Sequence, residues 1–199
     1  MEDHPRLDSE RMFALDQQAV RVEDTFVDGD LILDLGGGGE GVLGQIRGRQ
    51  VVALDIRRDE LEESPPGPIK IVGDAKALPF LDESFDAATA FFFLMYVPNQ
   101  DRAVVFAEAF RILKPGAKLH VWDAIIPPRG DRPQQMFVVP VQAEIPGKVI
   151  LTGYGTRWDG KEMSANSIAN LAAEAGFTVL EKTERGETFH LILFRKQAS

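Results

Sequence analysis

The stretch that most constrains this chain is LILDLGGGGEG at residues 31–41, where an apolar run with one aspartate leads into four consecutive glycines. Glycine has no Cβ and tolerates positive φ, so a strand ending at residues 36–39 can turn sharply and let another group approach its main chain. A tight turn without a ligand is the alternative, but such a turn seldom needs so many glycines. The stretch therefore predicts a buried strand followed by a ligand-binding turn.

Strand-like and helix-like segments alternate after this turn. Short apolar runs without polar alternation are typical of strands that are buried on both faces. These expected strands are LILDL at 31–35, VVALDI at 51–56, IKIVGD at 69–74, FDAATAFF from 85 and AKLHVWDAII at 117–126. Segments with helix signals separate most of them, at 40–48, 57–66 and 99–116. This alternation predicts an α/β fold with a parallel sheet and helices on both of its faces.

The N-terminal segment shows a helical pattern. Near the N-terminus, Met12, Leu15, Ala19 and Val22 share one helical face, so we expect a first helix there, capped by Asp8.

The last third predicts two hairpins with a helix between them. Residues 134–158 read as two strands joined at Pro146 and Gly147. The helix is capped by Ser164, and the second hairpin turns at Arg185 and Gly186, so the sheet is expected to end antiparallel.

Charge and composition exclude several classes of partner. The formal net charge is −9 and the basic residues are scattered, so we expect no nucleic-acid partner. The absence of cysteine excludes thiolate metal sites and cysteine nucleophiles, and we expect no metal. The N-terminus is charged from its second residue, and no apolar run approaches the roughly 20 residues of a membrane span. We therefore expect no membrane partner and a cytoplasmic location.

Two aspartates help to choose the ligand of the glycine turn. The pattern Gly36-x-Gly38-x-x-Gly41 also fits the dinucleotide fingerprint, in which a pyrophosphate lies at the N-terminus of the next helix. Asp34 would repel a pyrophosphate and suits a ligand with an ammonium or a sulfonium. Asp55, about 20 residues after the turn, is placed to accept hydrogen bonds from ribose hydroxyls, which fits NAD and other adenosine ligands alike. The alternative for Asp55 is a solvated acid at a strand end.

The loop GDAKALPFLDESFDAA follows the third expected strand. Asp74 begins this loop at the carboxyl end of the strand, and Ala75 leaves room beside it. The flat edge of an adenine, which carries an amino donor, requires such a place.

Four motifs, LDLGGGG, ALDI, GDAKALPFLDESFD and RILKPGAKL, follow one another between about residues 31 and 122, over nearly half of the chain. In order and spacing they resemble the class I S-adenosylmethionine-dependent methyltransferases, the group of the ubiquinone and menaquinone methyltransferases and many small-molecule methyltransferases. One departure is that Glu40, followed by Gly41, stands where the family's turn usually has its third glycine.

The resemblance implies a Rossmann-like α/β fold. Its sheet would have seven strands, mostly parallel, with helices on both faces, an antiparallel C-terminal hairpin strand and an extra β-hairpin inserted after the fifth strand. We expect a single domain over residues 1–199. Its parts would be an N-terminal helical segment at 1–28, a cofactor-binding core at 29–126, a variable hairpin at 127–160, and a C-terminal helix and strand hairpin at 161–199.

The resemblance also implies S-adenosylmethionine as cofactor and S-adenosylhomocysteine as its product. Asp34 would orient the methionine part, and the carbonyl of Phe91 would accept from the ammonium. Asp55 would hold the ribose diol, with Ile56 on the adenine face and Asp74 at its edge. The implied cofactor-binding residues are Asp34, Gly36, Gly37, Gly38, Asp55, Ile56, Asp74, Ala75 and Phe91.

Methyl transfer is an in-line displacement, so the protein chiefly holds a nucleophile about 3 Å from the methyl group with water excluded. An oxygen or carbon acceptor usually needs a base. The catalytic candidates are Tyr96 and Asp123, which follow the fourth and fifth strands; packing is the alternative for Tyr96, and capping of the next turn for Asp123. His120 lies inside a strand, where we favour a packed or exposed sheet residue over a base.

The segment at residues 127–158 is expected to cover the acceptor pocket. Its apolar residues are Met136, Phe137, Val139, Tyr154 and Trp158. The alternatives are that these residues pack on the sheet or form a homodimer contact.

The leading prediction is a methyltransferase that acts on a small-molecule acceptor. An NAD-dependent oxidoreductase fits the glycine fingerprint but leaves Asp34 and the loop at Asp74 unexplained. The other alternative is a domain that binds S-adenosylmethionine or its product without catalysis.

Overall fold

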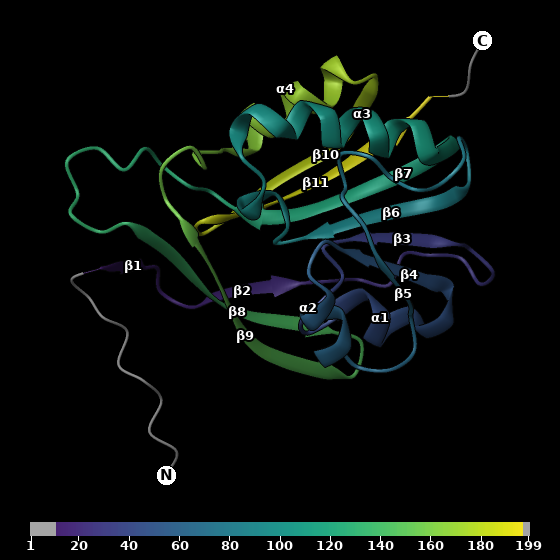
Figure 1. The fold of residues 1–199 in the computed structure, drawn as a ribbon, viewed down its shortest axis with the longest axis horizontal. Helices are drawn as coiled ribbons and strands as arrows, with labels where there is room; N and C mark the ends of the chain where they lie inside the picture. The colour runs from purple at the N-terminus through teal and green to yellow at the C-terminus, as the bar shows by residue number, and fades with distance from the viewer. Residues whose placement is uncertain (1–10, 197–199) are drawn as a thin grey trace.

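The computed structural model describes residues 11–196, and its largest element is a seven-stranded sheet (Figure 1). The strand order is β10-β11-β7-β6-β3-β4-β5. The strands are β3 (Ile32–Leu35), β4 (Val51–Asp55), β5 (Ile69–Val72), β6 (Phe85–Phe91), β7 (Leu113–Ala124), β10 (Phe177–Arg185) and β11 (Thr188–Arg195). Neighbours from β5 to β7 are parallel, whereas β11 is antiparallel to both β7 and β10. The predicted seven-stranded sheet with an antiparallel C-terminal hairpin is confirmed.

The order of the strands places a switch point beside β3. The chain runs outward from β3 through β4 to β5 and then returns to pair β6 with the other edge of β3. In open α/β sheets, ligands bind at the carboxyl ends of the strands where the order reverses in this way. All four residues of β3 are buried, as expected for a central strand.

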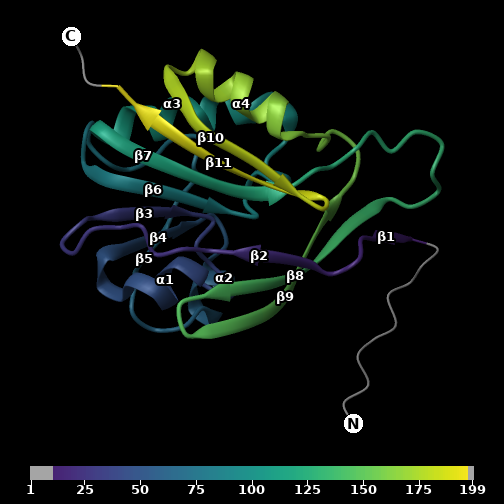
Figure 2. The same ribbon diagram turned by 180° about the vertical axis from the view of Figure 1, so that it is seen from behind.

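Helices lie on both sides of this sheet, as predicted. In Figures 1 and 2, α3 (Arg102–Ile112) and α4 (Ala165–Glu174) lie above the sheet, and α1 (Val42–Arg47) and α2 (Arg58–Glu63) lie below it. The described residues also form three 3₁₀ turns, η1 (Gly48–Gln50), η2 (Leu94–Tyr96) and η3 (Asn99–Asp101). Among the described residues, no helix has both the length and the apolar character needed to cross a bilayer.

The ends of the helices agree with the sequence in one case and differ in another. Ser164 forms a capping box with Ser167 at the start of α4, as predicted for the cap. The helix expected from Asn99 starts later, because the chain first makes the turn η3, and it ends at Ile112, where β7 begins directly. Ala103 is exposed and Phe106 is buried, so Ala103 does not belong to the buried face of this helix.

A second, smaller sheet lies beside the first (Figure 2). Strands β8 (Met136–Ile145) and β9 (Lys148–Arg157) form the predicted hairpin with its turn at Pro146 and Gly147. Strands β1 (Met12–Ala14) and β2 (Gln18–Arg21) pair one after the other, in parallel, with the free edge of β8.

The predicted N-terminal helix is wrong, because residues 12–14 and 18–21 are strands. Val20 and Val22 are buried while Ala19 and Arg21 are exposed, which is the period of two of a half-buried strand. The free edge of β8 offers hydrogen-bond partners that the local helical pattern of the sequence does not reveal. Asp8, the expected cap, lies outside the described residues.

Candidate functional site

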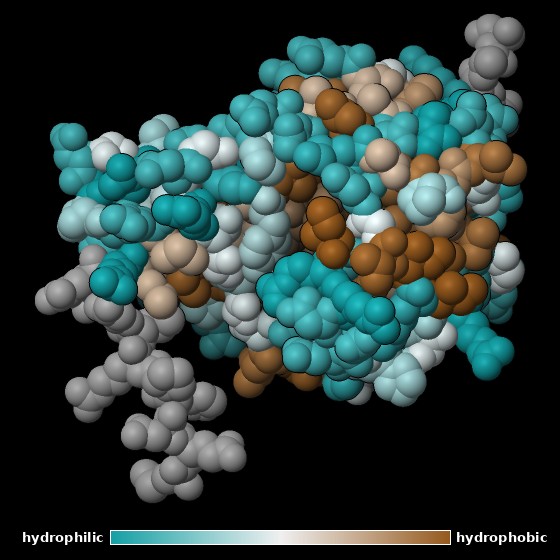
Figure 3. All heavy atoms as spheres, in the orientation of Figure 1, coloured by the Kyte–Doolittle hydropathy of each residue, from teal (hydrophilic) through white to brown (hydrophobic). Residues whose placement is uncertain are grey.

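A cavity of about 840 Å³ opens at the carboxyl ends of β3, β4, β5 and β6. The strand β9 of the second sheet closes its far side through Gly153, Tyr154 and Gly155. Figure 3 shows brown, hydrophobic side chains on this face of the molecule between hydrophilic surfaces above and below. The cavity therefore lies at the switch point of the large sheet and is shared with the β8–β9 hairpin.

The glycine turn forms one wall of this cavity. Gly36 has φ of 73°, a conformation that L side chains rarely adopt, and it turns the chain out of β3. At Gly38, a Cβ would lie 2.6 Å from Cβ of Glu60 and 3.0 Å from Oδ2 of Asp55. The turn is therefore pressed against α2 and against the strand-end carboxylate, which explains why these positions need glycine.

Asp34 lies beneath the turn rather than in the cavity. It is 3% exposed, and its Oδ1 accepts a hydrogen bond of 2.7 Å from the Thr89 hydroxyl. Burial raises the pKa of Asp34 to about 7, the hydrogen bond from Thr89 opposes this shift, and the nearby charge of Asp55 adds to it. Gly37 passes directly over Asp34 and also lies outside the cavity lining.

The other predicted cofactor residues all line the cavity. They are Gly36, Gly38, Asp55, Ile56, Asp74, Ala75 and Phe91. Asp55 Oδ1 accepts from the Arg57 N–H at 2.9 Å, and Asp74 Oδ1 accepts from the Lys76 N–H at 2.9 Å. The side chain of Ile56 is 66% exposed at the rim. The structure thus brings together carboxylates from the ends of β4 and β5 and an apolar side chain between them.

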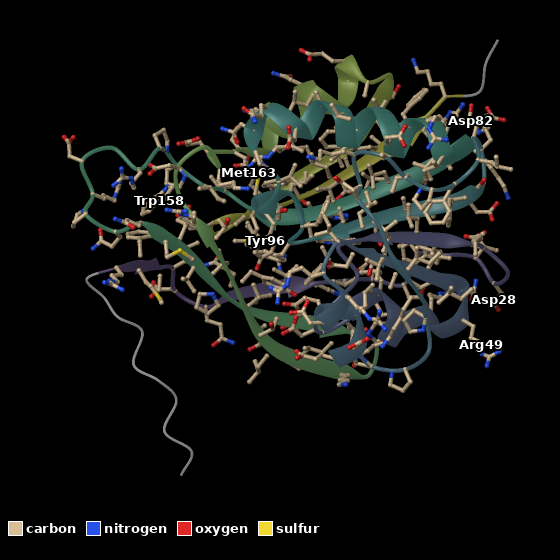
Figure 4. The ribbon with its side chains drawn as sticks, in the orientation of Figure 1. Asp28, Arg49, Asp82, Tyr96, Trp158 and Met163 are labelled. Carbon is tan, nitrogen blue, oxygen red and sulfur yellow. The ribbon has the colours of Figure 1, made fainter. Side chains whose placement is uncertain are left out.

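Of the two predicted catalytic residues, only Tyr96 lines the cavity. Figure 4 places it near the middle of the molecule, between the large sheet and the β8–β9 hairpin. Its hydroxyl accepts a hydrogen bond of 3.3 Å from the Gly155 N–H. Tyr96 as a whole is 46% exposed, but desolvation of its hydroxyl inside the cavity raises its pKa to about 12. At neutral pH the phenol therefore keeps its proton.

Asp123 lies outside the cavity and is fully buried. Its Oδ2 accepts from the Met95 N–H at 3.2 Å, and its Oδ1 accepts from the Ala124 N–H at 2.8 Å. Burial raises its pKa to about 7, while these backbone hydrogen bonds and the charge of Arg102 oppose the shift. Asp123 thus holds the turn η2, which ends at Tyr96.

Arg102 joins the same turn to residues 161 and 162. Its guanidinium donates to the carbonyls of Leu94, Lys161 and Glu162 at 3.3, 2.9 and 2.9 Å.

His120 is remote from this cavity, in agreement with the sheet residue favoured from the sequence. It stacks with Trp122 and His190 and lines a second cavity of about 580 Å³. Burial, with smaller contributions from His190 and Lys118, lowers its pKa to about 3.

Several lining residues were not singled out from the sequence. Phe92 and Phe93 follow β6, where the apolar run FFFL gave no sign of which rings face a cavity. Phe92 stacks on Tyr154 with ring centroids 4.8 Å apart and planes 6° apart. The charged lining is mostly acidic, with Glu40, Asp55, Glu60, Glu63, Asp74 and Asp101 against Arg57, Lys76 and Lys148.

Fold and site together define a doubly wound, Rossmann-like α/β protein with an acidic, nucleoside-sized cavity at its switch point. Comparison with known proteins points to the same class for part of the chain. Residues 33–121, a little under half of the chain, match the family described as "Methyltransferase domain". The resemblance to the class I S-adenosylmethionine-dependent methyltransferases drawn from the four motifs is confirmed over these residues.

Relatives and solved structures are similar to larger parts of the chain. The O-methyltransferase cnsE of Penicillium expansum is 28% identical over 168 residues, which are 78% of this chain and 55% of that protein. A demethylmenaquinone methyltransferase of Thermobifida fusca is 36% identical over 114 residues, 52% of this chain and 47% of that protein. The chain thus spans about half the length of these curated relatives. A structure of an S-adenosylmethionine-dependent methyltransferase from Methanosarcina mazei has the same fold, with a TM-score of 0.63, 23% identity, and coverage of 87% of this chain and 95% of that one.

Proposed function

We propose that this chain transfers a methyl group from S-adenosylmethionine to a small-molecule acceptor by in-line displacement. The observation that carries the proposal is the charge of the cavity, whose lining has six carboxylates against three cationic side chains. Such a lining disfavours the pyrophosphate of NAD and favours a ligand with a sulfonium and an ammonium. In this proposal the carboxylates of the lining, rather than Asp34, favour the positive charges of the ligand, since Asp34 lies below the glycine turn.

The residues of the cavity fit an adenosyl ligand. Asp55 projects a carboxylate from the end of β4, suited to ribose hydroxyls, and the exposed Ile56 beside it offers an apolar surface to an adenine face. Asp74 and the buried Ala75 form a polar edge with little bulk. When bound, S-adenosylmethionine supplies an electrophilic methyl group on sulfur.

We propose that the acceptor lies on the side of the cavity formed by aromatic rings. This aromatic wall consists of Phe91, Phe92, Phe93, Tyr96 and Tyr154. Aromatic rings can pack against a planar, apolar acceptor molecule and exclude water from the site. Water then cannot compete with the acceptor's nucleophilic atom for the methyl group. The protonated Tyr96 would donate a hydrogen bond to the acceptor rather than remove its proton. Asp123 has no part in this proposal as a base, because it lies outside the cavity.

The names of the relatives are consistent with a small-molecule acceptor. One relative is an O-methyltransferase and another a demethylmenaquinone methyltransferase. A cytoplasmic location stays a prediction, as does a homodimer.

The first experiment is calorimetric titration of the protein with S-adenosylmethionine, S-adenosylhomocysteine and NAD. We expect micromolar binding of the two adenosyl ligands, and a Kd raised about ten- to a hundredfold in Asp55→Ala because a hydrogen bond to a charged group is lost. The matched control is Asp131→Ala, in an exposed loop. Preferential binding of NAD would contradict the proposal.

Turnover is tested by release of S-adenosylhomocysteine with a panel of phenols, hydroquinones and amines. We expect release with at least one planar aromatic acceptor. Tight adenosyl binding without turnover across the panel would instead favour a domain that binds without catalysis.

A further inference from the structure

Glu40 stands at the end of the glycine turn, and its side chain bonds directly to one side chain of β9. Its carboxylate accepts a hydrogen bond from the Thr152 hydroxyl. Its main-chain carbonyl accepts from Nε2 of Gln45 at 2.6 Å, and Oε1 of the same Gln45 accepts from Nζ of Lys148 at 2.5 Å. Both Thr152 and Lys148 belong to β9, so the hairpin is bound to Glu40 directly by Thr152 and through Gln45 by Lys148.

These ties act on the inward face of β9. Along the strand, Ile150 and Thr156 are buried and Thr152 and Tyr154 half-buried, whereas Leu151 between them is 71% exposed. Thr152 and Tyr154 therefore point the same way. A hydrogen bond at Thr152 therefore also constrains the position of the Tyr154 ring in the cavity wall.

Tyr154 in turn completes the aromatic wall. Its ring stacks on Phe92 and meets Phe91 edge-on at 6.1 Å. The next residue, Gly155, donates its N–H to the Tyr96 hydroxyl. Hydrogen bonds at Thr152 and at Gly155 thus hold β9 on either side of Tyr154.

Within the hairpin, β9 is held less firmly than β8, which pairs with β1 and β2 and is buried in the core on its inward face. Within the described chain, β9 pairs along one edge only, with β8, and its outer face carries the exposed Val149 and Leu151. Strands with little burial on one side open locally at low cost. Side-chain hydrogen bonds to the body of the protein therefore add to the pairing with β8 in setting how often this strand opens.

We propose that Glu40 is a positioning residue that holds β9 so that Tyr154 forms the wall of the acceptor compartment. The inference rests on the proposed function, which supplies the reason for an acceptor compartment. Glu40 also lines the cavity beside the glycine turn, so a ligand bound at the turn and the hairpin contact the same residue. Coupling between two such sites is reciprocal. S-adenosylhomocysteine should therefore close the hairpin, and loss of the tie should weaken S-adenosylhomocysteine by the same factor.

The chain offers a direct probe, because it has two tyrosines and both line the cavity. Labelling with 3-fluorotyrosine gives two fluorine signals, assigned with Tyr96→Phe. The decisive pair of variants is Thr152→Val, which removes the hydroxyl at constant volume, and Thr152→Ser, which keeps it. Thr178→Val on the edge strand β10 is the matched control.

We expect Thr152→Val to shift the Tyr154 signal toward that of a solvent-exposed tyrosine. Amide exchange over residues 149–156 should become about tenfold faster, the scale of one lost hydrogen bond to a charged group. Thr152→Ser and the control should behave as the wild type. In Glu40→Gly the effect of Thr152→Val on amide exchange should be much smaller than in the wild type, since both changes remove the contact between Glu40 and Thr152.

The inference is overturned if Thr152→Val leaves the Tyr154 signal and the exchange of β9 unchanged, or if Thr152→Ser behaves like Thr152→Val. Both comparisons are made without ligand as well, so they stand even if S-adenosylhomocysteine does not bind. Failure of the wild type to bind it would instead count against the proposed function.

Discussion

Replacing Asp34 by asparagine is expected to change how the stability of this protein depends on pH. Asp34 is buried in the central strand β3 and bound by the Thr89 hydroxyl. Its pKa rises from the ordinary 3.8 to about 7, chiefly because burial disfavours the carboxylate. Asparagine has nearly the same shape and keeps an oxygen that accepts from Thr89, so the substitution mainly removes the ionisation.

The sign and size follow from proton linkage. Between about pH 4 and pH 7 the folded protein holds a proton on Asp34 that the unfolded chain has lost, so unfolding releases one proton. The contribution of Asp34 to the free energy of unfolding is therefore full below the unfolded pKa and is lost as pH rises through the folded pKa. The slope is about 1.4 kcal/mol per pH unit, or about 4 kcal/mol across the whole shift.

Other groups titrate in the same range, so the difference between two proteins is the quantity to measure. Asp123 has a raised pKa and acts in the same direction as Asp34. His120 and His190 have pKa values lowered to about 3 and 4, chiefly by burial, and act in the opposite direction below the unfolded pKa of histidine. These terms are common to both proteins and cancel in the difference.

The assay is urea unfolding followed by far-ultraviolet circular dichroism at several pH values between 5 and 7. The free energy of unfolding of Asp34→Asn minus that of the wild type should rise by about 1.4 kcal/mol per pH unit. Asp131→Asn, at an exposed loop position, controls for the change in net charge and should give a constant difference. A constant difference for Asp34→Asn would refute the reasoning, since it would mean that the native protein already carries an ionised Asp34 at pH 5.

Two further substitutions test the packing around the cavity. Gly38→Ala places a Cβ 2.6 Å from Cβ of Glu60 and should lower the free energy of unfolding, measured in urea, by about 1–3 kcal/mol. In Gly153→Ala the new Cβ would have its nearest neighbour at 3.8 Å, so the free energy of unfolding should fall clearly less. Equal effects of the two substitutions would contradict the reasoning. Arg102→Met removes a buried guanidinium that faces Asp123 and should cost about 3–5 kcal/mol in thermal or urea unfolding. A cost below about 1 kcal/mol would show that the charge of Arg102 matters little there.

The wall of the cavity at the ends of β3, β4 and β5 was predictable because its residues come from local patterns. A buried run predicts a strand, and the residue at its carboxyl end then lies at the edge where the neighbouring strands also end. Asp55 and Asp74 needed no knowledge of distant contacts for this reason. Asp34 was placed on the right strand, but its burial beneath Gly37 depends on the path of the turn.

The second sheet was beyond such reasoning because it joins distant parts of the chain. Phe13 pairs with Phe137, and Val20 with Ala143. The alternation at Val20 and Val22 was a strand signal, yet over so few residues it competes with a helical pattern that fits equally well. Only the edge of β8 decides between them.

The aromatic wall depends on a left-handed backbone conformation at Phe92, which the sequence does not reveal. Phe92 has φ of 49°, in the left-handed region that costs a non-glycine residue roughly 1–2 kcal/mol. Its N–H donates to the Trp122 carbonyl at 2.8 Å, and its ring is buried against Tyr154. The contacts that hold this conformation come from β7 and β9, two strands that are built from later parts of the sequence. The left-handed conformation of Phe92 at the end of β6 therefore depends on β7 and on the β8–β9 hairpin, whereas the glycine turn at the end of β3 follows from its own residues.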